Sequence, residues 1–353
     1  MKKIKIGIIG VGSISESHIA GYKKLPNVEL YAFCDINEER LKEKGKKYGV
    51  TNLFTDVNEM VKLEGLDGVS VCVWNCSHYD CTMAALKAGL NVLCEKPLAM
   101  NAKQAQEMKD MADKMGKLLM VGFVMRFGDE SRIAFDFING GYIGDIYYSK
   151  ATYLRRHGSP GGWFADINRS GGGPVIDLGV HVIDHTRYLM GKPQPISVYA
   201  STYNHLKDRP DCKNDVDWKA ADAKDTDVYG VEDIGIALIK YDNGSTTLLE
   251  TSYSLNGEPS TKKEIYGTKG GMSLAGEPII YTEVNGYLAD ITPKTKNLKN
   301  SGGNMFDQEM AHFVDCIENG TECIAPAEDG ITVMKILDAI YESAKTGHEV
   351  TIK

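Results

Sequence analysis

The first part of the chain alternates short apolar runs with polar segments of helical periodicity. The apolar runs lie at Lys5–Ile9, Glu29–Cys34, Val69–Val73, Asn91–Leu93 and Leu118–Gly122, and the helical segments include Glu38–Tyr48, Tyr79–Ala88 and Ala102–Lys114. Strands buried on both faces of a parallel sheet are typically continuous apolar runs, and helices connect them. Residues 1–122 are therefore expected to form a doubly wound parallel sheet.

The pattern changes after Arg126, where strand-like runs follow one another without regular helices between them. These runs lie at Ile146–Tyr153, Ile196–Tyr203, Glu232–Tyr241, Ser245–Tyr253 and Lys263–Gly267. Asn243-Gly244 indicates a hairpin turn, because both residues accept positive φ at little cost. The expected fold class is α/β, with a second domain over 123–353 built on a large, mostly antiparallel open sheet.

Helices at Gly173–Met190, Phe306–Glu318 and Glu328–Lys345 are expected to cover one face of this second sheet. The other face would carry Ile234, Ile236, Leu238, Leu248 and Tyr253. An apolar open face favours association with a second copy, so a homodimer or homotetramer is expected. The polar stretch 204–227 is expected to be a long exposed loop.

Composition excludes several classes of protein. The 353 residues carry a formal charge of −8 without a basic cluster, which argues against nucleic acid or an anionic membrane as partner. No run approaches the ~18 apolar residues of a membrane span, and the start lacks a signal-peptide cleavage site, so a cytoplasmic protein is expected. The eight cysteines form no CxxC pair and are expected to be free, mostly buried thiols, with no metal.

A glycine-rich turn follows the first strand. In Gly10-Val-Gly12-Ser13-Ile14-Ser15 the two glycines would let backbone N–H groups approach a pyrophosphate at a helix N-terminus. Asp35 ends the second strand, where a carboxylate can accept hydrogen bonds from ribose hydroxyls. Because no Arg or Lys follows it immediately, NAD is expected to be preferred over NADP as cofactor.

Further residues at the ends of strands are candidates for cofactor contacts. They are Ser13 and Ile14 in the turn, Trp74, Asn75 and His78 after the third long strand, Glu95 and Lys96 after the next, and Arg126. Lys96 in Glu95-Lys96-Pro97 would lie beside the nicotinamide and stabilise a developing alkoxide.

A helix expected after Gly171-Gly172-Gly173-Pro174 carries acids and imidazoles at helical spacing. Asp177, His181 and His185 recur every four residues and Asp184 lies three beyond His181, so one face holds all four. We interpret His181 as a general base and Asp177 as a group that binds substrate or tunes it. A zinc pair at His181 and His185 and a purely structural histidine are the alternatives. Arg155 and Trp163 are candidates for substrate binding.

Together these motifs resemble the Gfo/Idh/MocA family. The resemblance spans essentially the whole chain and includes the glycine turn, Ala85 to Pro97, Gly171 to His181 and the Val231–Tyr253 hairpin. It implies an NAD(P)-binding Rossmann domain, a C-terminal α/β domain used for assembly, and catalysis by Lys96, Asp177 and His181 on a secondary alcohol of a sugar, cyclitol or related polyol. Asn75-Cys76 departs from the Thr-Pro that the family often has.

Two other activities are compatible with the same residues. An NAD-dependent glycosidase of similar fold oxidises its sugar only transiently and releases the aglycone. A non-catalytic sensor binds the dinucleotide and a partner protein, although the presence of Lys96, Asp177 and His181 together argues against it.

Overall fold

The computed structural model describes residues 3–206, 219–224, 227, 229–295 and 304–353. Among them, no helix is long and apolar enough to cross a membrane. The chain forms two compact units, Met1–Phe127 with Gly302–Ile331, and Gly128–Ser301 with Thr332–Lys353. The first unit extends past the boundary expected after residue 122 and also takes in a segment near the C-terminus.

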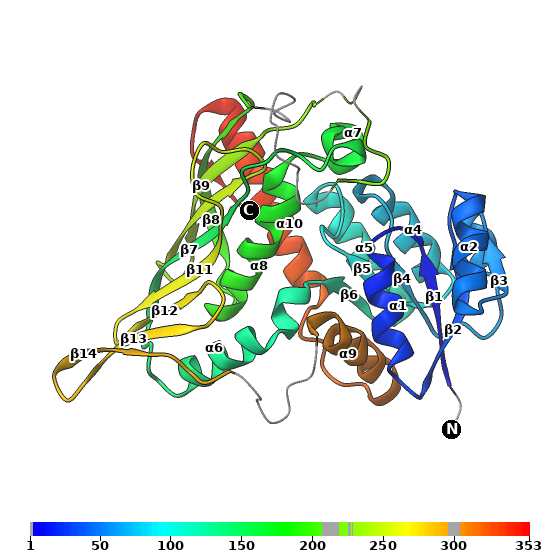
Figure 1. Cartoon of the computed structure of the whole chain (residues 1–353), viewed down its shortest axis with the longest axis horizontal. Coiled ribbons are helices and arrows are strands. Elements are labelled where there is room, and N and C mark those ends of the chain that lie inside the picture. The colour runs from blue at the N-terminus through cyan, green and yellow to red at the C-terminus, as the bar shows by residue number, and fades with distance from the viewer. Residues whose placement is uncertain (1–2, 207–218, 225–226, 228, 296–303) are drawn as a thin grey trace. The chain divides into compact units, whose positions relative to one another are not determined.

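The first unit is built on a six-stranded, all-parallel sheet in the order β3-β2-β1-β4-β5-β6. Its strands are β1 (Ile4–Ile9), β2 (Val28–Cys34), β3 (Asn52–Phe54), β4 (Gly68–Val71), β5 (Asn91–Glu95) and β6 (Leu119–Gly122). The helices are α1 (Ser15–Lys23), α2 (Glu38–Tyr48), α3 (Val57–Met60), α4 (Asn75–Lys87) and α5 (Ala102–Met115), followed by the short 3-10 helix η1 (Val124–Phe127) (Figure 1). This is the doubly wound sheet that the apolar runs predicted.

The strand order reverses between β1 and β4, and ligands bind at such a switch point, outside the carboxyl ends of the strands. The glycine turn, Asp35, Trp74 and Lys96 all follow carboxyl ends of strands in this sheet. The fold of the first unit therefore gathers these candidate residues along one edge.

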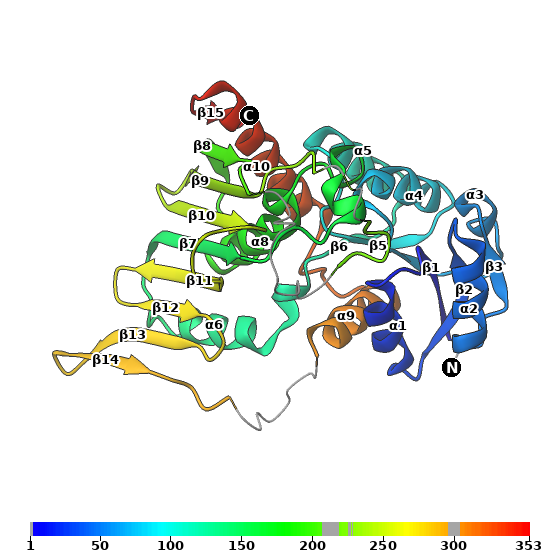
Figure 2. The ribbon, with the colours of Figure 1, turned by 45° about the horizontal axis from the view of Figure 1, so that its top comes forward.

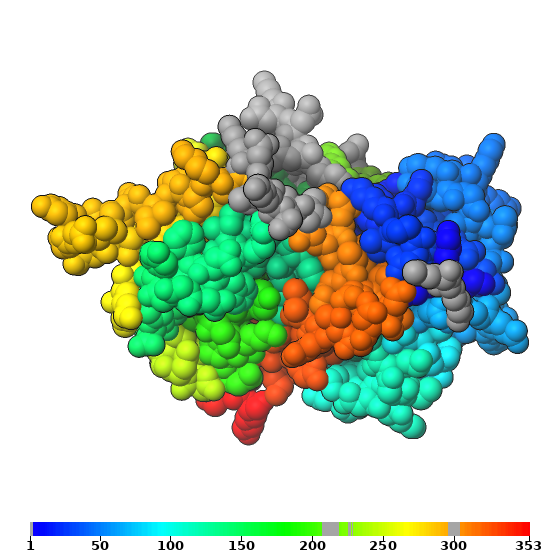
Figure 3. All heavy atoms as spheres, turned by 90° about the horizontal axis from the view of Figure 1, so that it is seen from below, coloured from blue at the N-terminus to red at the C-terminus, as the bar shows by residue number. Residues whose placement is uncertain are grey.

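The segment near the C-terminus completes the first unit. Helix α9 (Met305–Asn319) packs against α1, as the neighbouring orange and blue surfaces in Figure 3 show. The backbone N–H of Val121 donates to the carbonyl of Ala325 at 2.9 Å, and the buried guanidinium of Arg126 is paired with Asp329 at 2.8 Å. The prediction that the helix at Phe306–Glu318 covers a face of the second sheet is therefore wrong: α9 belongs to the first unit, where the long-range path of the chain brings it against α1 and η1.

The second unit contains a nine-stranded sheet in the order β14-β13-β12-β11-β7-β10-β9-β8-β15 (Figure 2). Its strands are β7 (Ile146–Leu154), β8 (Pro195–Tyr203), β9 (Ile234–Tyr241), β10 (Thr246–Ser252), β11 (Ser260–Gly267), β12 (Gly271–Leu274), β13 (Ile279–Val284), β14 (Tyr287–Ile291) and β15 (Val350–Thr351). Among the described strands of this second sheet, only β7 and β10 pair in parallel, so the sheet is mostly antiparallel, as expected.

The second unit also contains three longer helices, α6 (Asp129–Asn139), α8 (Val180–Leu189) and α10 (Ala327–Thr346). The first residues of α10 belong to the first unit. Residues of β9 alternate strictly, so that Ala237 and Ile239 are buried whereas Ile236 and Leu238 are 37% and 45% exposed. One face of the sheet is therefore covered and the other is open and apolar. Tyr253, expected on the open face, is instead 1% exposed, because it turns toward the helices.

The expected helix Gly173–Met190 forms in two parts. Its first turn is a π-helix, η3 (Val175–Gly179), and the α-helix α8 follows. Turns of this kind are rare and occur frequently at functional sites. Much of the polar stretch 204–227 lies outside the described residues.

Candidate active site

The glycine turn after β1 leaves open space beside its backbone. A Cβ on Gly10, whose φ is +86°, would lie 2.5 Å from the carbonyl oxygen of Cys72, so this position requires glycine for packing. A Cβ on Gly12 would meet nothing within 4 Å. The glycine at position 12 is thus not needed for packing, and the free volume fits a pyrophosphate against the start of α1. Ser13 and Ile14 lie in this turn.

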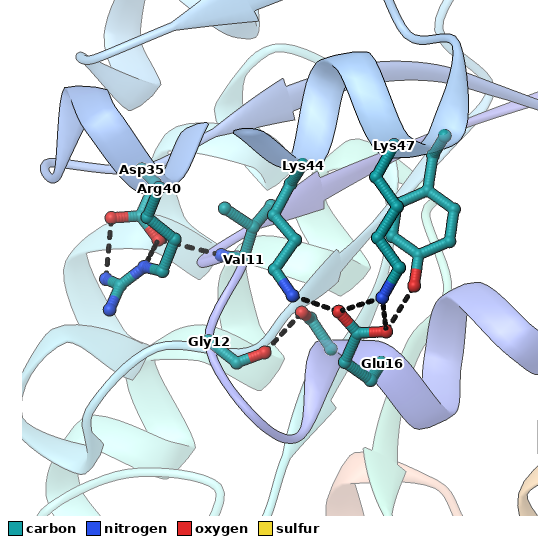
Figure 4. Close-up of polar contacts among 9 residues, drawn as sticks. Val11, Gly12, Glu16, Asp35, Arg40, Lys44 and Lys47 are labelled. Atoms are coloured by element: carbon teal, nitrogen blue, oxygen red, sulfur yellow. Dashed lines mark hydrogen bonds and ion pairs between the residues drawn. The ribbon is translucent and has the colours of Figure 1, made fainter. Parts of the chain in front are cut away.

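Asp35 follows β2 and is tied to the glycine turn (Figure 4). Its Oδ2 accepts a hydrogen bond of 2.8 Å from the N–H of Val11, and its Oδ1 accepts one of the same length from Asn37. Arg40 donates to both carboxylate oxygens, from Nε at 3.1 Å and from Nη2 at 2.8 Å. Arg40 stands five residues beyond Asp35, so the residues that immediately follow Asp35 in the sequence do not reveal this cation.

A second polar cluster joins α1 to α2 beside the turn (Figure 4). Glu16 accepts hydrogen bonds from Lys44, Lys47 and Tyr48. Although partial burial acts to raise it, these bonds lower the pKa of Glu16 to about 2. The cluster holds the N-terminal part of α1 in place next to the turn.

Lys96 follows the carboxyl end of β5 and is partly exposed, whereas its neighbour Glu95 is 6% exposed. Oε1 of Glu95 lies 2.8 Å from Nε2 of His18, which comes from α1. The Lys96–Pro97 peptide bond is cis. Glu95 is therefore a structural anchor of this turn as well as a candidate cofactor contact, a role that the sequence did not reveal.

Glu309 of α9 completes a buried cluster with His18 and Glu95, in which one potential ligand atom from each lies within 4.8 Å of the others. Glu309 is fully buried, and its carboxylate oxygens have no hydrogen-bond partner within the described part of the chain. Burial and the charge of Glu95 raise the pKa of Glu309 well above its ordinary value. A neutral carboxylic acid accounts for this burial without a bound cation.

Two of the remaining candidates in the first unit have structural partners. Nδ1 of the buried His78 lies 2.7 Å from the carbonyl oxygen of Pro97 and its Nε2 lies 3.2 Å from that of Val73. Arg126 is buried in its pair with Asp329. Both side chains therefore have structural partners within the first unit, and their contact with a cofactor stays a prediction. Trp74 and Asn75 lie at the start of α4, where Trp74 is partly exposed and Asn75 is buried.

In the second unit, Asp177 and His181 are partly exposed among largely buried neighbours on η3 and α8. Asp184 and His185, expected on the same accessible face, are each 1% exposed, and Nε2 of His185 lies 3.0 Å from Oγ of Ser131. His181, Asp184 and His185 all lie in the regular α-helix α8, so the difference in exposure comes from the side chains that pack around each residue, such as Ser131 against His185, and not from the helical spacing. A zinc pair at His181 and His185 does not fit this arrangement.

Asp177 is surrounded by polar partners from strand ends. The buried Tyr253 donates a hydrogen bond of 2.8 Å from its hydroxyl to Oδ2 of Asp177. Burial acts to lower the pKa of Arg155, but Tyr153 and the negative charge of Asp177 raise it above its ordinary value. Arg155 therefore belongs to the same electrostatic cluster as Asp177.

Trp163 lies on the 3-10 helix η2 (Gly162–Ala165) and packs on Phe164, with ring centroids 3.9 Å apart. A cavity of about 510 Å³ adjoins this helix and is lined in part by Gly162, Arg169 and Asp222. The backbone N–H of Trp163 donates to Oδ1 of Asp222, which lines this cavity, at 3.4 Å.

The described cysteines are free, and Cys34, Cys72, Cys81 and Cys94 are buried, as expected. Cys212 lies outside the described residues. His312, Cys316 and Cys323 form a half-buried cluster with ligand atoms within 4.8 Å of one another. A hydrogen bond from Cys316, aided by His312, lowers the pKa of Cys323 to about 5 against the effect of burial. Nε2 of His312 already accepts the N–H of Ile324 at 3.0 Å, which opposes metal binding through that nitrogen.

Comparisons with known proteins agree with both units. The model of an oxidoreductase family with an NAD-binding Rossmann fold matches residues 4–123, and the model of its C-terminal α/β domain matches residues 136–352. The D-glucoside 3-dehydrogenase of Escherichia coli K12 is 33% identical over 353 residues, covering 99% of this chain and 97% of that protein.

More distant proteins share the full length. The myo-inositol 2-dehydrogenase of Thermotoga maritima is 25% identical and covers 99% of each chain. A solved structure of levoglucosan dehydrogenase in complex with NADH superposes with a TM-score of 0.87 at 23% identity, with both chains fully covered, which shows a common fold. With both domain models matched in order, the chain belongs to the Gfo/Idh/MocA family of oxidoreductases.

Proposed function

We propose that this oxidoreductase transfers a hydride between a nicotinamide dinucleotide and a secondary alcohol of a sugar, cyclitol or related polyol. The observation that carries the proposal is the pair Asp177 and His181, the accessible polar residues on an otherwise buried π–α segment. The relationship to a D-glucoside 3-dehydrogenase favours a glucoside as the first substrate to test.

Each proposed role follows from side-chain chemistry. His181 takes the proton of the reacting hydroxyl as a general base, and Asp177 binds the substrate or supports the imidazole. Lys96 donates hydrogen bonds to the oxygen as negative charge develops on it. Arg155 and Trp163 contact polar and apolar faces of the sugar. The bound dinucleotide supplies the hydride acceptor. Because Lys96 and His181 belong to different units, their convergence on one oxygen is itself part of the proposal.

Gly10, Gly12, Ser13 and Ile14 would hold the pyrophosphate, and Asp35 the adenosine ribose, with NAD preferred over NADP. The carboxylate of Asp35 would repel a 2′-phosphate. Arg40 offsets part of that charge, since its guanidinium is paired with both carboxylate oxygens. Trp74 and Asn75 at the start of α4 would contact the nicotinamide half.

We further propose a cytoplasmic homodimer or homotetramer that associates through the open face of the nine-stranded sheet. Ile236 and Leu238 project from this face and are about as exposed as Ile196 of β8. Replacing Ile236 and Leu238 by lysine should convert the assembly to monomers in light scattering. Leu288, 93% exposed on the projecting β13–β14 hairpin (Figure 3), provides a control position for a new lysine.

The decisive experiment is a panel of glucosides, free sugars and cyclitols with NAD and with NADP, in which reduced cofactor is followed by absorbance. The variants Lys96→Met and His181→Ala should each lower turnover by roughly 10²-fold or more. Dinucleotide affinity, measured by fluorescence titration, should remain within a few-fold for His181→Ala. Wild-type turnover in both variants would refute the assigned roles.

A parallel assay of released aglycone separates the glycosidase activity from the dehydrogenase activity. Aglycone release without net reduced cofactor would replace the proposal with the glycosidase. Absence of either product across the panel, with intact dinucleotide binding, would favour the sensor.

A further inference from the structure

The carboxylate of Glu232 binds the backbone at the start of the π-turn that carries Asp177. Glu232 precedes β9, and its Oε2 accepts the N–H of Gly173 at 2.9 Å while its Oε1 accepts the N–H of Val175 at 3.1 Å. These amides flank Pro174, at the start of η3. An anion is favourable here because the first N–H groups of a helix lack partners within the helix.

A third donor orients this carboxylate. The hydroxyl of Tyr341, from α10, donates to Oε1 of Glu232 at 3.0 Å. Burial raises the pKa of Glu232, and the hydrogen bonds from Gly173, Val175 and Tyr341 act against that rise. Three donors on two oxygens match an ionised carboxylate, which accepts hydrogen bonds without donating any.

The glycines of the preceding turn make this close approach possible. A Cβ on Gly172 would lie 2.0 Å from the hydroxyl oxygen of Tyr341, and a Cβ on Gly173 would lie 2.2 Å from the backbone oxygen of Glu232. On the other side, Thr251 donates a hydrogen bond of 2.8 Å to the carbonyl of Pro174. The backbone that leads into Asp177 is therefore fixed on both sides.

We infer that Glu232, oriented by Tyr341, is a positioning residue that sets the π-turn so that Asp177 and His181 face the substrate together. This inference rests on the proposed function. A carboxamide at this position keeps the shape but has one acceptor oxygen, so its NH₂ group would face a backbone N–H. The π-turn would then relax, and small displacements of reacting groups cost up to ~10²-fold in rate.

The test compares Glu232→Gln with Asp233→Asn. Asp233 is buried, and its Oδ2 accepts hydrogen bonds from two backbone amides of the segment after β8, those of His205 and Leu206. Glu232→Gln should lower kcat by about 10- to 100-fold, leave the dissociation constant for NAD unchanged, and shift the acid limb of the pH–kcat profile. Asp233→Asn should lose thermal stability without moving that limb.

The variant Tyr341→Phe keeps the ring and removes one donor, so it should produce a smaller shift of the same limb and serves where Glu232→Gln does not fold. Wild-type kcat and an unmoved limb in the folded variants would overturn the inference. The variant His181→Ala distinguishes failure of the proposed function from failure of the positioning role of Glu232. If His181→Ala retains full turnover, the proposed function fails, whereas an inactive His181→Ala beside a fully active Glu232→Gln contradicts only the positioning role.

Discussion

The hydroxyl of Tyr253 donates a hydrogen bond of 2.8 Å to the carboxylate of Asp177, and the tyrosine that makes it is 1% exposed. The bond connects the end of a central strand to the π-turn. It removes one rotational freedom from a carboxylate that otherwise lies near the surface.

Removing this hydroxyl with Tyr253→Phe should lower kcat/KM by about 10- to 100-fold, because loss of a hydrogen bond to a charged group typically costs ~1.5–3 kcal/mol. Steady-state kinetics with the best substrate measure the effect. Tyr241→Phe removes another buried hydroxyl of the same sheet, bonded to Thr247, and should leave kcat/KM unchanged. Equal kinetic losses in the two variants would show that Tyr253 acts only through stability.

The two glycines of the turn should respond differently to alanine. Gly12→Ala should keep the thermal midpoint and weaken dinucleotide binding by ~10-fold or more, because the new methyl enters free space that the pyrophosphate needs. Gly10→Ala should instead lower the midpoint, because φ is +86° there and the methyl meets the Cys72 carbonyl. Calorimetry and fluorescence titration check both, and unaltered NAD affinity in Gly12→Ala would exclude this turn as the pyrophosphate site.

Arg40 should influence the choice of cofactor. Arg40→Ala removes the cation beside Asp35 and should reduce kcat/KM for NADP relative to NAD by about 10-fold. Lys42→Ala is the matched control, since Lys42 lies on the same helix and pairs with the exposed Glu38. A ratio that does not change, or that moves toward NADP, would contradict this role of Arg40.

Glu309 should make stability depend on pH. In the folded protein the pKa of Glu309 lies well above the value of about 4.5 in the unfolded chain. Below pH 4.5 the carboxyl group is protonated in both states, so its burial as an acid costs no ionisation energy. As the pH rises from 4.5 toward the folded-state pKa, the free energy of unfolding decreases. Glu309→Gln keeps the size without the ionisable group, so denaturant unfolding should show a larger gain in stability at pH 8 than at pH 5. Glu318→Gln, on the exposed end of the same helix, should be neutral. A Glu309→Gln variant that is destabilised equally at both pH values would show that the carboxylate has an ionic partner.

Local patterns determined much of this protein. Continuous apolar runs separated by helical segments were sufficient to predict the parallel sheet, because a strand with both faces covered needs no polar side. Gly10, Gly12 and Asp35 were also recognisable from local sequence. The glycines lie in a short turn directly after one strand, and the carboxylate lies directly after the next strand. Spacing placed Asp177 and His181 on one helix together with Asp184 and His185, but it did not distinguish the first two residues from the other two.

The tertiary structure decided which of these residues are accessible. Asp184, His185, His78 and Arg126 looked like site residues but are buried, because their partners come from other segments of the chain. Glu232, Tyr253 and Glu309 carried no local signal, since their importance comes from what lies across from them. The spacing of residues in the sequence indicates the period of a helix. It does not indicate contacts between distant segments, such as those that bring the carboxylate of Glu232 to the backbone N–H groups of Gly173 and Val175 at the start of the π-turn.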